Sequence, residues 1–220
     1  MTQFLIVRHG ETLWNRERRI QGQGNSPLSP GGVRQAQAVA RRLAEAGAVR
    51  IVASDLGRTV ETAQPVAAAA GLRLATDARL RERAFGIFEG LTPDEIAARH
   101  PEHHARWQTR EAEFEIPGGE SLNQLQARVQ AAFEALAAPA VPAVSAASVP
   151  GAGAGPVIIV THGGVLDAVY RIAVGVAPGA PRTWQLLNAS INQVSIDGSG
   201  WQVGPWGDIG HLAGAEDDFS

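Results

Sequence analysis

Two stretches of the chain end an apolar run with a histidine followed by a glycine. In FLIVRHG the apolar run Phe4–Val7 leads into Arg8 and His9, and in PVIIVTHGG a similar run leads into His162 and Gly163. Continuous apolar runs of this length predict strands that are buried on both faces. Ligands bind at the carboxyl ends of strands in parallel α/β sheets, so these side chains are expected together at one edge of a sheet.

A third strand end supplies a second arginine. VRIVAS predicts a short strand that ends at Ser54 and Asp55, and Arg58 then falls in the first turn of the next helix. Two arginines present forked donors that suit a tetrahedral oxyanion, and helix N-termini add backbone N–H groups. Neighbouring cations of this kind need an anion between them, so the three strand ends predict a phosphate pocket.

The histidines point to covalent chemistry at that pocket. A neutral imidazole can attack phosphorus and form a phosphohistidine, which divides one transfer into two easier steps. The surrounding cations would spread the charge of the transferring phosphoryl group. An acid must then protonate the leaving oxygen. The segment LRERAFGIFEG offers two candidates for that acid, Glu82 and Glu89.

Strand and helix patterns alternate along the chain, which predicts an α/β fold. We expect a three-layer αβα sandwich with a mostly parallel central sheet. INQVSIDGSGWQVGPW reads as a hairpin around residues 197–200 and should supply an antiparallel edge. Helical spacing occurs in LSPGGVRQAQAVARRLAEAG, DLGRTVETAQPVAAAAG, PDEIAARH, ESLNQLQARVQAAFEALA and VLDAVYRIAVG.

Three local features of these helices are specific enough to test. In the first helix, Ser29 is expected at the N-cap and Gly47 at the C′ position. Pro65 should interrupt or kink the second helix. The predicted apolar face of the first helix consists of Val33, Ala36, Val39, Ala40 and Leu43.

Composition limits the class of protein. A chain of 220 residues with 45% hydrophobic content is expected to form one domain over 1–220. The net charge of -3, with no basic block, argues against a nucleic-acid partner. No apolar run is long enough to span a bilayer and the start lacks a signal-peptide pattern, so we expect a cytoplasmic protein without a membrane partner. The chain has no cysteine, which excludes disulfides, a thiol nucleophile and Cys-ligated zinc.

Three segments call for a simpler interpretation. Residues 138–156 are rich in alanine, proline and glycine and read as a surface loop. The GAGAG inside them precedes a strand, so it is not interpreted as a dinucleotide-binding turn. HPEHH, residues 100–104, has histidines at a spacing that could bind a metal, but a solvent-facing segment is the favoured interpretation. The acidic tail from about residue 214 is expected to fray.

Four motifs, VRHGETLWN, SDLGRTVETA, LRERAFGIFEG and VTHGGV, occur in this order and resemble the histidine phosphatase superfamily, also called phosphoglycerate mutase-like. The resemblance runs from the first strand to beyond His162. It implies that His9 is the phosphorylated nucleophile and that Glu82 is the proton donor. Family chemistry of this kind needs no metal and no cofactor. The phosphoryl oxygens and the substrate side would be contacted by Arg8, Arg58, His162, Gly163, Asn15, Gln21 and Gly22.

Within this family the sequence favours a phosphatase that acts on a small phosphomonoester. Mutases that depend on 2,3-bisphosphoglycerate typically carry a glycine- and asparagine-rich stretch with a lysine after the acid, whereas this chain has FGIFEGLTPDEIAARHPE and then PGGES. Such a mutase is the first alternative, and a phosphate-binding protein without turnover is the second. A homodimer is compatible with the resemblance.

Several residues also have a structural interpretation. Asn15 could cap its own loop, and Glu89 could take the place of Glu82. Trp14 and Trp107 could contact an organic leaving group, but packing in the protein interior explains them equally well.

Overall fold

A computed structural model describes residues 1–138 and 155–213 of the chain. Most of the predicted 138–156 loop and the predicted acidic tail lie outside the described residues. The described part forms one six-stranded sheet with strand order β3-β2-β4-β1-β5-β6. The strands are β1 (Thr2–Arg8), β2 (Arg50–Ala53), β3 (Leu74–Thr76), β4 (Val157–Thr161), β5 (Ile191–Asp197) and β6 (Gly200–Val203).

The first four strands of this order are parallel, and the predicted hairpin β5–β6 adds the antiparallel edge. Register decides which side chains meet at the carboxyl ends. Arg8 at the end of β1 is opposite Thr161 at the end of β4, while Ala53 at the end of β2 is opposite Val160. The residues that follow these three strands therefore begin at nearly the same level of the sheet.

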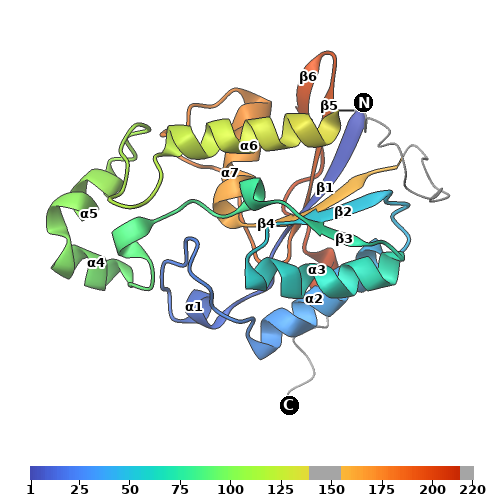
Figure 1. The fold of residues 1–220 in the computed structure, drawn as a ribbon, viewed down its shortest axis with the longest axis horizontal. Helices are drawn as coiled ribbons and strands as arrows, with labels where there is room; N and C mark the ends of the chain where they lie inside the picture. The colour runs from blue at the N-terminus through green and yellow to red at the C-terminus, as the bar shows by residue number, and fades with distance from the viewer. Residues whose placement is uncertain (139–154, 214–220) are drawn as a thin grey trace.

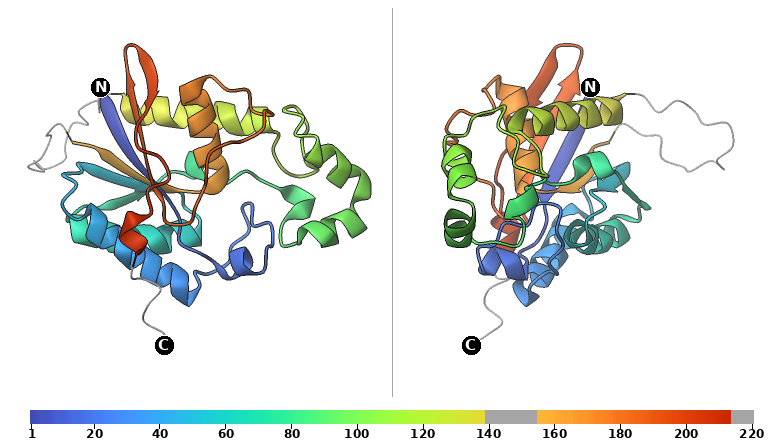
Figure 2. Two further views of the ribbon diagram at one scale, coloured as in Figure 1. Left: turned by 180° about the vertical axis from the view of Figure 1, so that it is seen from behind. Right: turned by 60° about the vertical axis from the view of Figure 1, so that its left-hand side comes forward.

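Helices cover both faces of the sheet, which is the predicted three-layer arrangement (Figures 1 and 2). On one face α6 (Leu122–Ala137) and α7 (Gly163–Val174) pack against apolar side chains such as Phe4 and Ile159. On the other face α2 (Pro30–Leu43) and α3 (Gly57–Ala70) pack against the alternate residues of the same strands. Burial on both faces explains why β1 and β4 are continuous apolar runs.

A separate apolar cluster supports the part of the chain at the left of Figure 1. It consists of Phe88, Ile96, Phe114 and Ile116, all buried. The segment contains η2 (Gly86–Phe88), α4 (Pro93–Arg99) and α5 (Pro101–Gln108), and it lies beside α1 (Leu13–Arg16). Before it along the chain, η1 (Ala78–Leu80) packs in the main core beneath α6, and η3 (Gly210–Leu212) is the last element of the described residues.

Two local predictions for the helices were wrong, and Pro65 does not interrupt its helix. Val33 lies in the first turn of α2 and is 45% exposed, so it is not part of the buried face. The helix ends at Leu43, so Gly47, with φ +63°, belongs to the following turn and is not the C′ residue. Pro65 lies inside α3, which continues to Ala70 and ends at Gly71. Buried packing of the α3 residues on both sides of Pro65 outweighs the cost of about 3 kcal/mol for an interior proline.

The sequence patterns also missed some elements. The short edge strand β3 and helix α5 were not predicted, and α5 contains His103 and His104 of the HPEHH segment. His103 stacks on Phe114 and His104 lies against Trp107. Within residues 1–138 and 155–213, no group of three or more metal-ligating side chains is placed to hold a metal ion.

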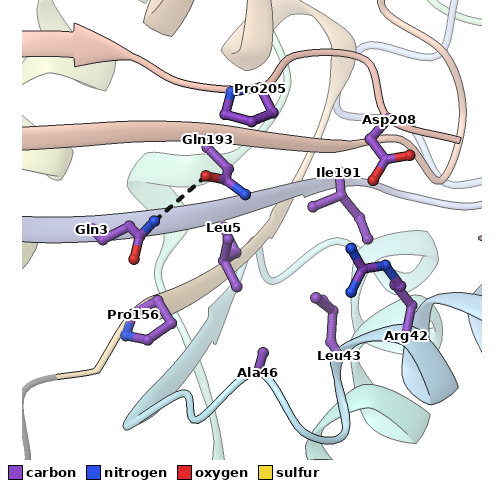
Figure 3. Close-up of a pocket in the computed structure, with 10 residues that line it drawn as sticks. All are labelled: Gln3, Leu5, Arg42, Leu43, Ala46, Pro156, Ile191, Gln193, Pro205 and Asp208. Atoms are coloured by element: carbon purple, nitrogen blue, oxygen red, sulfur yellow. Dashed lines mark hydrogen bonds between the residues drawn. The ribbon is translucent and has the colours of Figure 1, made fainter. Parts of the chain in front are cut away.

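A cavity of about 250 Å³ opens beside the first half of β1, on the face covered by α2 (Figure 3). Its lining residues are Gln3, Leu5, Arg42, Leu43, Ala46, Pro156, Ile191, Gln193, Pro205 and Asp208. None of the predicted phosphate-binding residues contributes to it. In the described part of the chain, no helix combines the length and the apolar character needed to cross a membrane.

Candidate active site

The residues that follow β1, β4 and β2 converge as their register requires. The backbone N–H of His9 donates to Thr161 O at 2.9 Å, and that of Ser54 donates to Val160 O at 3.0 Å. The imidazole rings of His9 and His162 lie edge to face, with centroids 5.3 Å apart. Both side chains are almost completely buried, so the two strands deliver a pair of histidines to one enclosed position.

Among the described residues, His9 is held by one ring nitrogen only. Its Nδ1 lies 2.8 Å from the carbonyl oxygen of Gly10, which can only accept, so Nδ1 carries the proton and Nε2 keeps its lone pair. The turn is anchored by Thr62 in α3, whose Oγ1 accepts from the Gly10 N–H at 3.0 Å. Burial, reinforced by the Arg8 and Arg58 cations, holds the pKa of His9 well below 6.5. Nε2 is therefore an unprotonated nitrogen at neutral pH.

His162 is held from the opposite side of its ring. Its Nε2 lies 2.9 Å from Ser54 Oγ, while its Nδ1 is buried and has no hydrogen-bond partner among the described residues. Burial, together with the nearby Arg58 and His9, holds the pKa of His162 well below 6.5 as well. A buried nitrogen without a partner at the meeting point of two strands is a position that a ligand atom can satisfy.

Arg58 is the most buried cation of the site, with 1% of its surface exposed. Its Nη1 and Nη2 each donate at 2.7 Å to backbone carbonyls, those of Gly24 and Gly22, and its Nε has no partner in the described structure. Burial lowers the pKa of Arg58 to about 10, which still leaves it charged at neutral pH. The carbonyls thus fix the orientation of a guanidinium whose charge no carboxylate neutralises directly.

Arg8 lies on the other side of His9. Its Nη1 donates to the carbonyl of Leu186, and its Nε is buried without a partner among the described residues. A Cβ placed on Gly163 would lie 3.5 Å from Arg8 Nε and 3.9 Å from Glu82 Oε2. These are ordinary contact distances, so the start of α7 lies beside both Arg8 and Glu82. Burial lowers the pKa of Arg8, and the Glu82 carboxylate opposes that effect.

The two candidate acids occupy different surroundings. Glu82 accepts the Gly164 N–H at 3.0 Å and the Arg83 N–H at 2.8 Å, so it lies over the N-terminus of α7, near Arg8. A Cβ on Gly164 would overlap Glu82 Oε1, so this approach requires glycine. Glu89 instead accepts three backbone N–H groups, those of Gln23, Gly24 and Phe85, and holds the loop that orients Arg58.

Comparison with known proteins agrees with this geometry. Residues 4–209 match the Histidine phosphatase superfamily (branch 1). The chain belongs to this superfamily.

Individual relatives cover almost the whole chain. The probable phosphoglycerate mutase GpmB of Yersinia pestis is 38% identical over 217 residues, which cover 96% of this chain and 95% of that protein. Among solved structures, Bacillus stearothermophilus YhfR has a TM-score of 0.82 at 30% identity and covers 96% of this chain and 100% of its own. A mycobacterial glucosyl-3-phosphoglycerate phosphatase in complex with VO3 has a TM-score of 0.76 at 32% identity, with coverage of 94% and 99%. The superfamily therefore includes relatives named as mutases and as phosphatases.

Asn15 has the capping role that was one of its two interpretations. Its Oδ1 accepts from the N–H and the hydroxyl of Thr12 at 3.1 Å each, which forms the capping box of α1. Asn188 lies between this cap and the histidine, because its Nδ2 is 3.4 Å from Asn15 Oδ1 and 3.0 Å from His9 O. The Asn188 side-chain amide thus connects Asn15 to the His9 backbone. The Oδ1 atom of Asn15 already accepts from Thr12 and Asn188.

Gln21 and Gly22 begin the loop that holds Arg58. Gln21 is 8% exposed, and its Oε1 has no partner among the described residues. Gly22 has φ +52°, and a Cβ there would overlap Glu89 Oε1, so the left-handed conformation and the close approach both require glycine. Its contribution to the site is the carbonyl oxygen that accepts from Arg58 Nη2.

Both tryptophans pack against protein groups. A Cβ on Gly24 would lie 3.2 Å from the Trp14 ring, and one on Gly90 would lie 3.5 Å from it, so this indole fills the space between two loops. The centroid of the Trp107 ring lies 5.6 Å from that of Phe88, which belongs to the separate apolar cluster described above. Both tryptophans have packing partners and are half-buried, so contact with a leaving group stays a prediction for each.

Three side chains that organise the site had no assigned role in the sequence analysis. Ser54 bonds to His162, Thr62 anchors Gly10, and Asn188 bonds to the His9 carbonyl. Ser54 stands at a predicted strand end beside the strand of His162, so strand order alone could have indicated its contact. Thr62 and Asn188 meet the His9 turn from distant parts of the chain, and no local pattern predicts those contacts.

Proposed function

We propose that this histidine phosphatase family member is a metal-independent phosphomonoester hydrolase that forms a phosphohistidine on His9. The proposal rests mainly on one observation: a buried His9 imidazole with its Nδ1 fixed by Gly10 O and its Nε2 free. Arg8 and Arg58 flank it, each with a buried Nε that lacks a partner in the described structure. These groups suit a phosphate dianion better than any neutral ligand.

In the first step His9 Nε2 attacks phosphorus as the bond from phosphorus to the ester oxygen breaks. Glu82 gives its proton to that oxygen, and the alcohol leaves. Arg8, Arg58 and His162 donate to the three non-bridging oxygens, whose charge is spread in the transition state. The Gly10 carbonyl accepts from His9 Nδ1 and stabilises the positive charge that the ring acquires.

In the second step a water molecule attacks the phosphohistidine, and Glu82 takes the proton that the water loses. Phosphate leaves and His9 returns to its neutral form. A bound metal has no part in either step, because cationic side chains already neutralise the phosphoryl oxygens. The substrate in this proposal is a small phosphorylated metabolite. The two steps together hydrolyse its phosphomonoester bond.

A phosphoglycerate mutase is the second candidate, and the name of the 38% identical relative favours it. A mutase returns the phosphoryl group to a second hydroxyl before water attacks. The absence of lysine from the chain, and of the glycine- and asparagine-rich stretch after Glu82, argues for the hydrolase. The phosphatase relative at 32% identity supports the same choice.

Phosphorus NMR separates the candidates. The protein is incubated with 3-phosphoglycerate and a trace of 2,3-bisphosphoglycerate in excess chelator, and p-nitrophenyl phosphate is used in parallel. We expect p-nitrophenol and free phosphate from the aryl ester, and no catalytic formation of 2-phosphoglycerate. Catalytic conversion to 2-phosphoglycerate would identify a mutase. Binding of inorganic phosphate without turnover of either compound would identify a binding protein.

A further inference from the structure

We propose that Ser54 is a positioning residue that fixes the tautomer of His162, with the proton on Nδ1. This tautomer directs a donor at the phosphoryl group, whereas the other tautomer would direct a lone pair at it. The inference rests on the proposed phosphoryl-transfer function, since that function gives the Nδ1 proton an acceptor.

Hydrogen-bond accounting at Ser54 selects the tautomer. Its Oγ is 2.9 Å from His162 Nε2, and it accepts from the Leu56 N–H at 3.4 Å. If Ser54 donates to Nε2, its hydroxyl proton and the Leu56 donor are both satisfied. If Nε2 carried the proton instead, the Ser54 hydroxyl proton would have no acceptor among the described residues. Ser54 is fully buried, so an unpaired donor there would cost stability.

The surroundings of His162 Nδ1 are consistent with this tautomer. His162 is 0% exposed, and its Nδ1 has no partner among the described residues. A phosphoryl oxygen can only accept, so it pairs with Nδ1–H and would be repelled by a lone pair on Nδ1. Burial disfavours the doubly protonated ring. One neutral tautomer therefore satisfies both the protein on one side and a phosphate on the other.

The backbone holds Ser54 in place for this role. Its N–H donates to Val160 O at 3.0 Å, and its carbonyl accepts from Thr59 Oγ1 at 2.9 Å. Ser54 is thus fixed between β4, which carries His162, and the first turn of α3, which carries Arg58. The turn from Ser54 to Arg58 therefore positions Arg58, one proposed phosphate donor. The same turn sets the protonation of His162, the other proposed donor.

The test is side-chain nitrogen NMR of the full-length resting protein, with the His162 signals assigned by their loss in His162→Gln. We expect Nδ1 protonated and Nε2 unprotonated in the wild type. In Ser54→Ala we expect a mixture of tautomers. Ser190→Ala is the matched control, because Ser190 is also fully buried and its hydroxyl accepts from Asn192 and has no contact with His162 among the described residues. Its His162 signals should be unchanged.

Kinetics and binding supply the functional readout. Ser54→Ala should lower kcat for p-nitrophenyl phosphate by about 10-fold, the lower end of effects for residues that orient a catalytic group. The dissociation constant for inorganic phosphate should rise with it, and Ser54→Thr should restore both because it keeps the hydroxyl. Ser190→Ala should change neither quantity.

A wild-type spectrum with the proton on Nε2 of His162 would overturn the inference without any variant. Equal losses in Ser54→Ala and Ser190→Ala would also overturn it, since they would show a packing effect. Neither result bears on hydrolysis itself, which the aryl phosphate assay of the wild type tests separately. The expected tautomer in a protein that fails to hydrolyse phosphomonoesters would refute the proposed function alone.

Discussion

The ends of β1 and β4 are nearly identical in sequence, yet they present their histidines in opposite ways. Both strands are apolar and parallel, and each is followed by a buried histidine and a glycine. At the end of β1, the backbone of Gly10 holds His9 by Nδ1 and leaves Nε2 free. At the end of β4, the side chain of Ser54 holds His162 by Nε2 and leaves Nδ1 free.

In the proposed mechanism, this difference separates a nucleophile from a donor. A carbonyl can only accept, so it forces the proton onto His9 Nδ1 and leaves a lone pair toward the site. A hydroxyl can also donate, so Ser54 can leave the proton on the nitrogen of His162 that faces the site. Two similar strand ends thus acquire complementary roles because different elements meet them.

The largest expected effect tests that separation of roles. His9→Gln should lower kcat for p-nitrophenyl phosphate by about 10⁴-fold or more, because no other group can carry the phosphoryl intermediate. His162→Gln should lower it by about 10²-fold, since it removes one donor to the transition state. Rapid quenching should trap a phosphoenzyme with His162→Gln and none with His9→Gln. A phosphoenzyme in the His9 variant would reverse the assignment.

The next effect concerns the cation that faces both histidines. Arg58→Ala should lower kcat/KM by about 10²- to 10³-fold and weaken phosphate binding, because it removes a buried charge aimed at the phosphoryl oxygens. Arg42→Ala is the control, since Arg42 lines the cavity of Figure 3 and contacts none of the site residues. Similar losses in both variants would mean that general electrostatics, and not local geometry, determines activity.

Glu82 and Glu89, the two candidates for the general acid, can be compared in the same way. Glu82→Gln should slow alkyl phosphates by about 10- to 100-fold more than p-nitrophenyl phosphate, because only a poor leaving group needs a proton. Glu89→Gln disturbs the loop at Gln23 and Gly24 and should slow both substrate types equally. Steady-state rates with alkyl phosphates and with p-nitrophenyl phosphate distinguish the roles of the two carboxylates. A leaving-group dependence in the Glu89 variant would move the acid role to that residue.

A smaller effect is expected in the pH profile. The pKa of His9 is held well below 6.5 by burial and the two arginines, so the nucleophile stays unprotonated as the pH falls through 6.5. The acid limb of kcat/KM should therefore lie below pH 6.5, as measured with p-nitrophenyl phosphate in constant-ionic-strength buffers. Loss of activity centred at or above pH 6.5 would contradict the neutral state of His9.

The smallest effect is on stability. Both histidines have folded-state pKa values below the unfolded value of about 6.5, so below that pH the unfolded chain binds protons that the folded protein does not. The free energy of unfolding should fall as the pH drops below about 6.5, by up to about 1.4 kcal/mol per pH unit for each histidine. Urea unfolding between pH 7 and pH 5 should show this slope, and it should be smaller in His9→Gln and in His162→Gln. A slope unchanged in both variants would assign the acid sensitivity to other groups.

The layered fold and the residues of the proposed phosphate pocket could be predicted from the sequence alone. The alternation of apolar runs and helical spacing predicted the three layers, the parallel strands and the hairpin edge. The identities of Arg8, His9, Arg58 and His162 at strand ends predicted their convergence, because the carboxyl ends of parallel strands share one edge. Local propensity was less reliable at Val33, Gly47 and Pro65, where tertiary packing decided exposure and helix length.

Which atom of each group faces the site depends on contacts between elements that are distant in the sequence. The partners that orient the two histidines differ: Gly10 is the next residue after His9, whereas Ser54 is 108 positions from His162 and meets it through strand order. The sequence favoured Glu82 over Glu89 as the acid through the family resemblance, and only the structure shows how their backbone partners differ. Residue types are a local property of the chain, but hydrogen bonds between side chains on different elements exist only when the sheet brings those elements together.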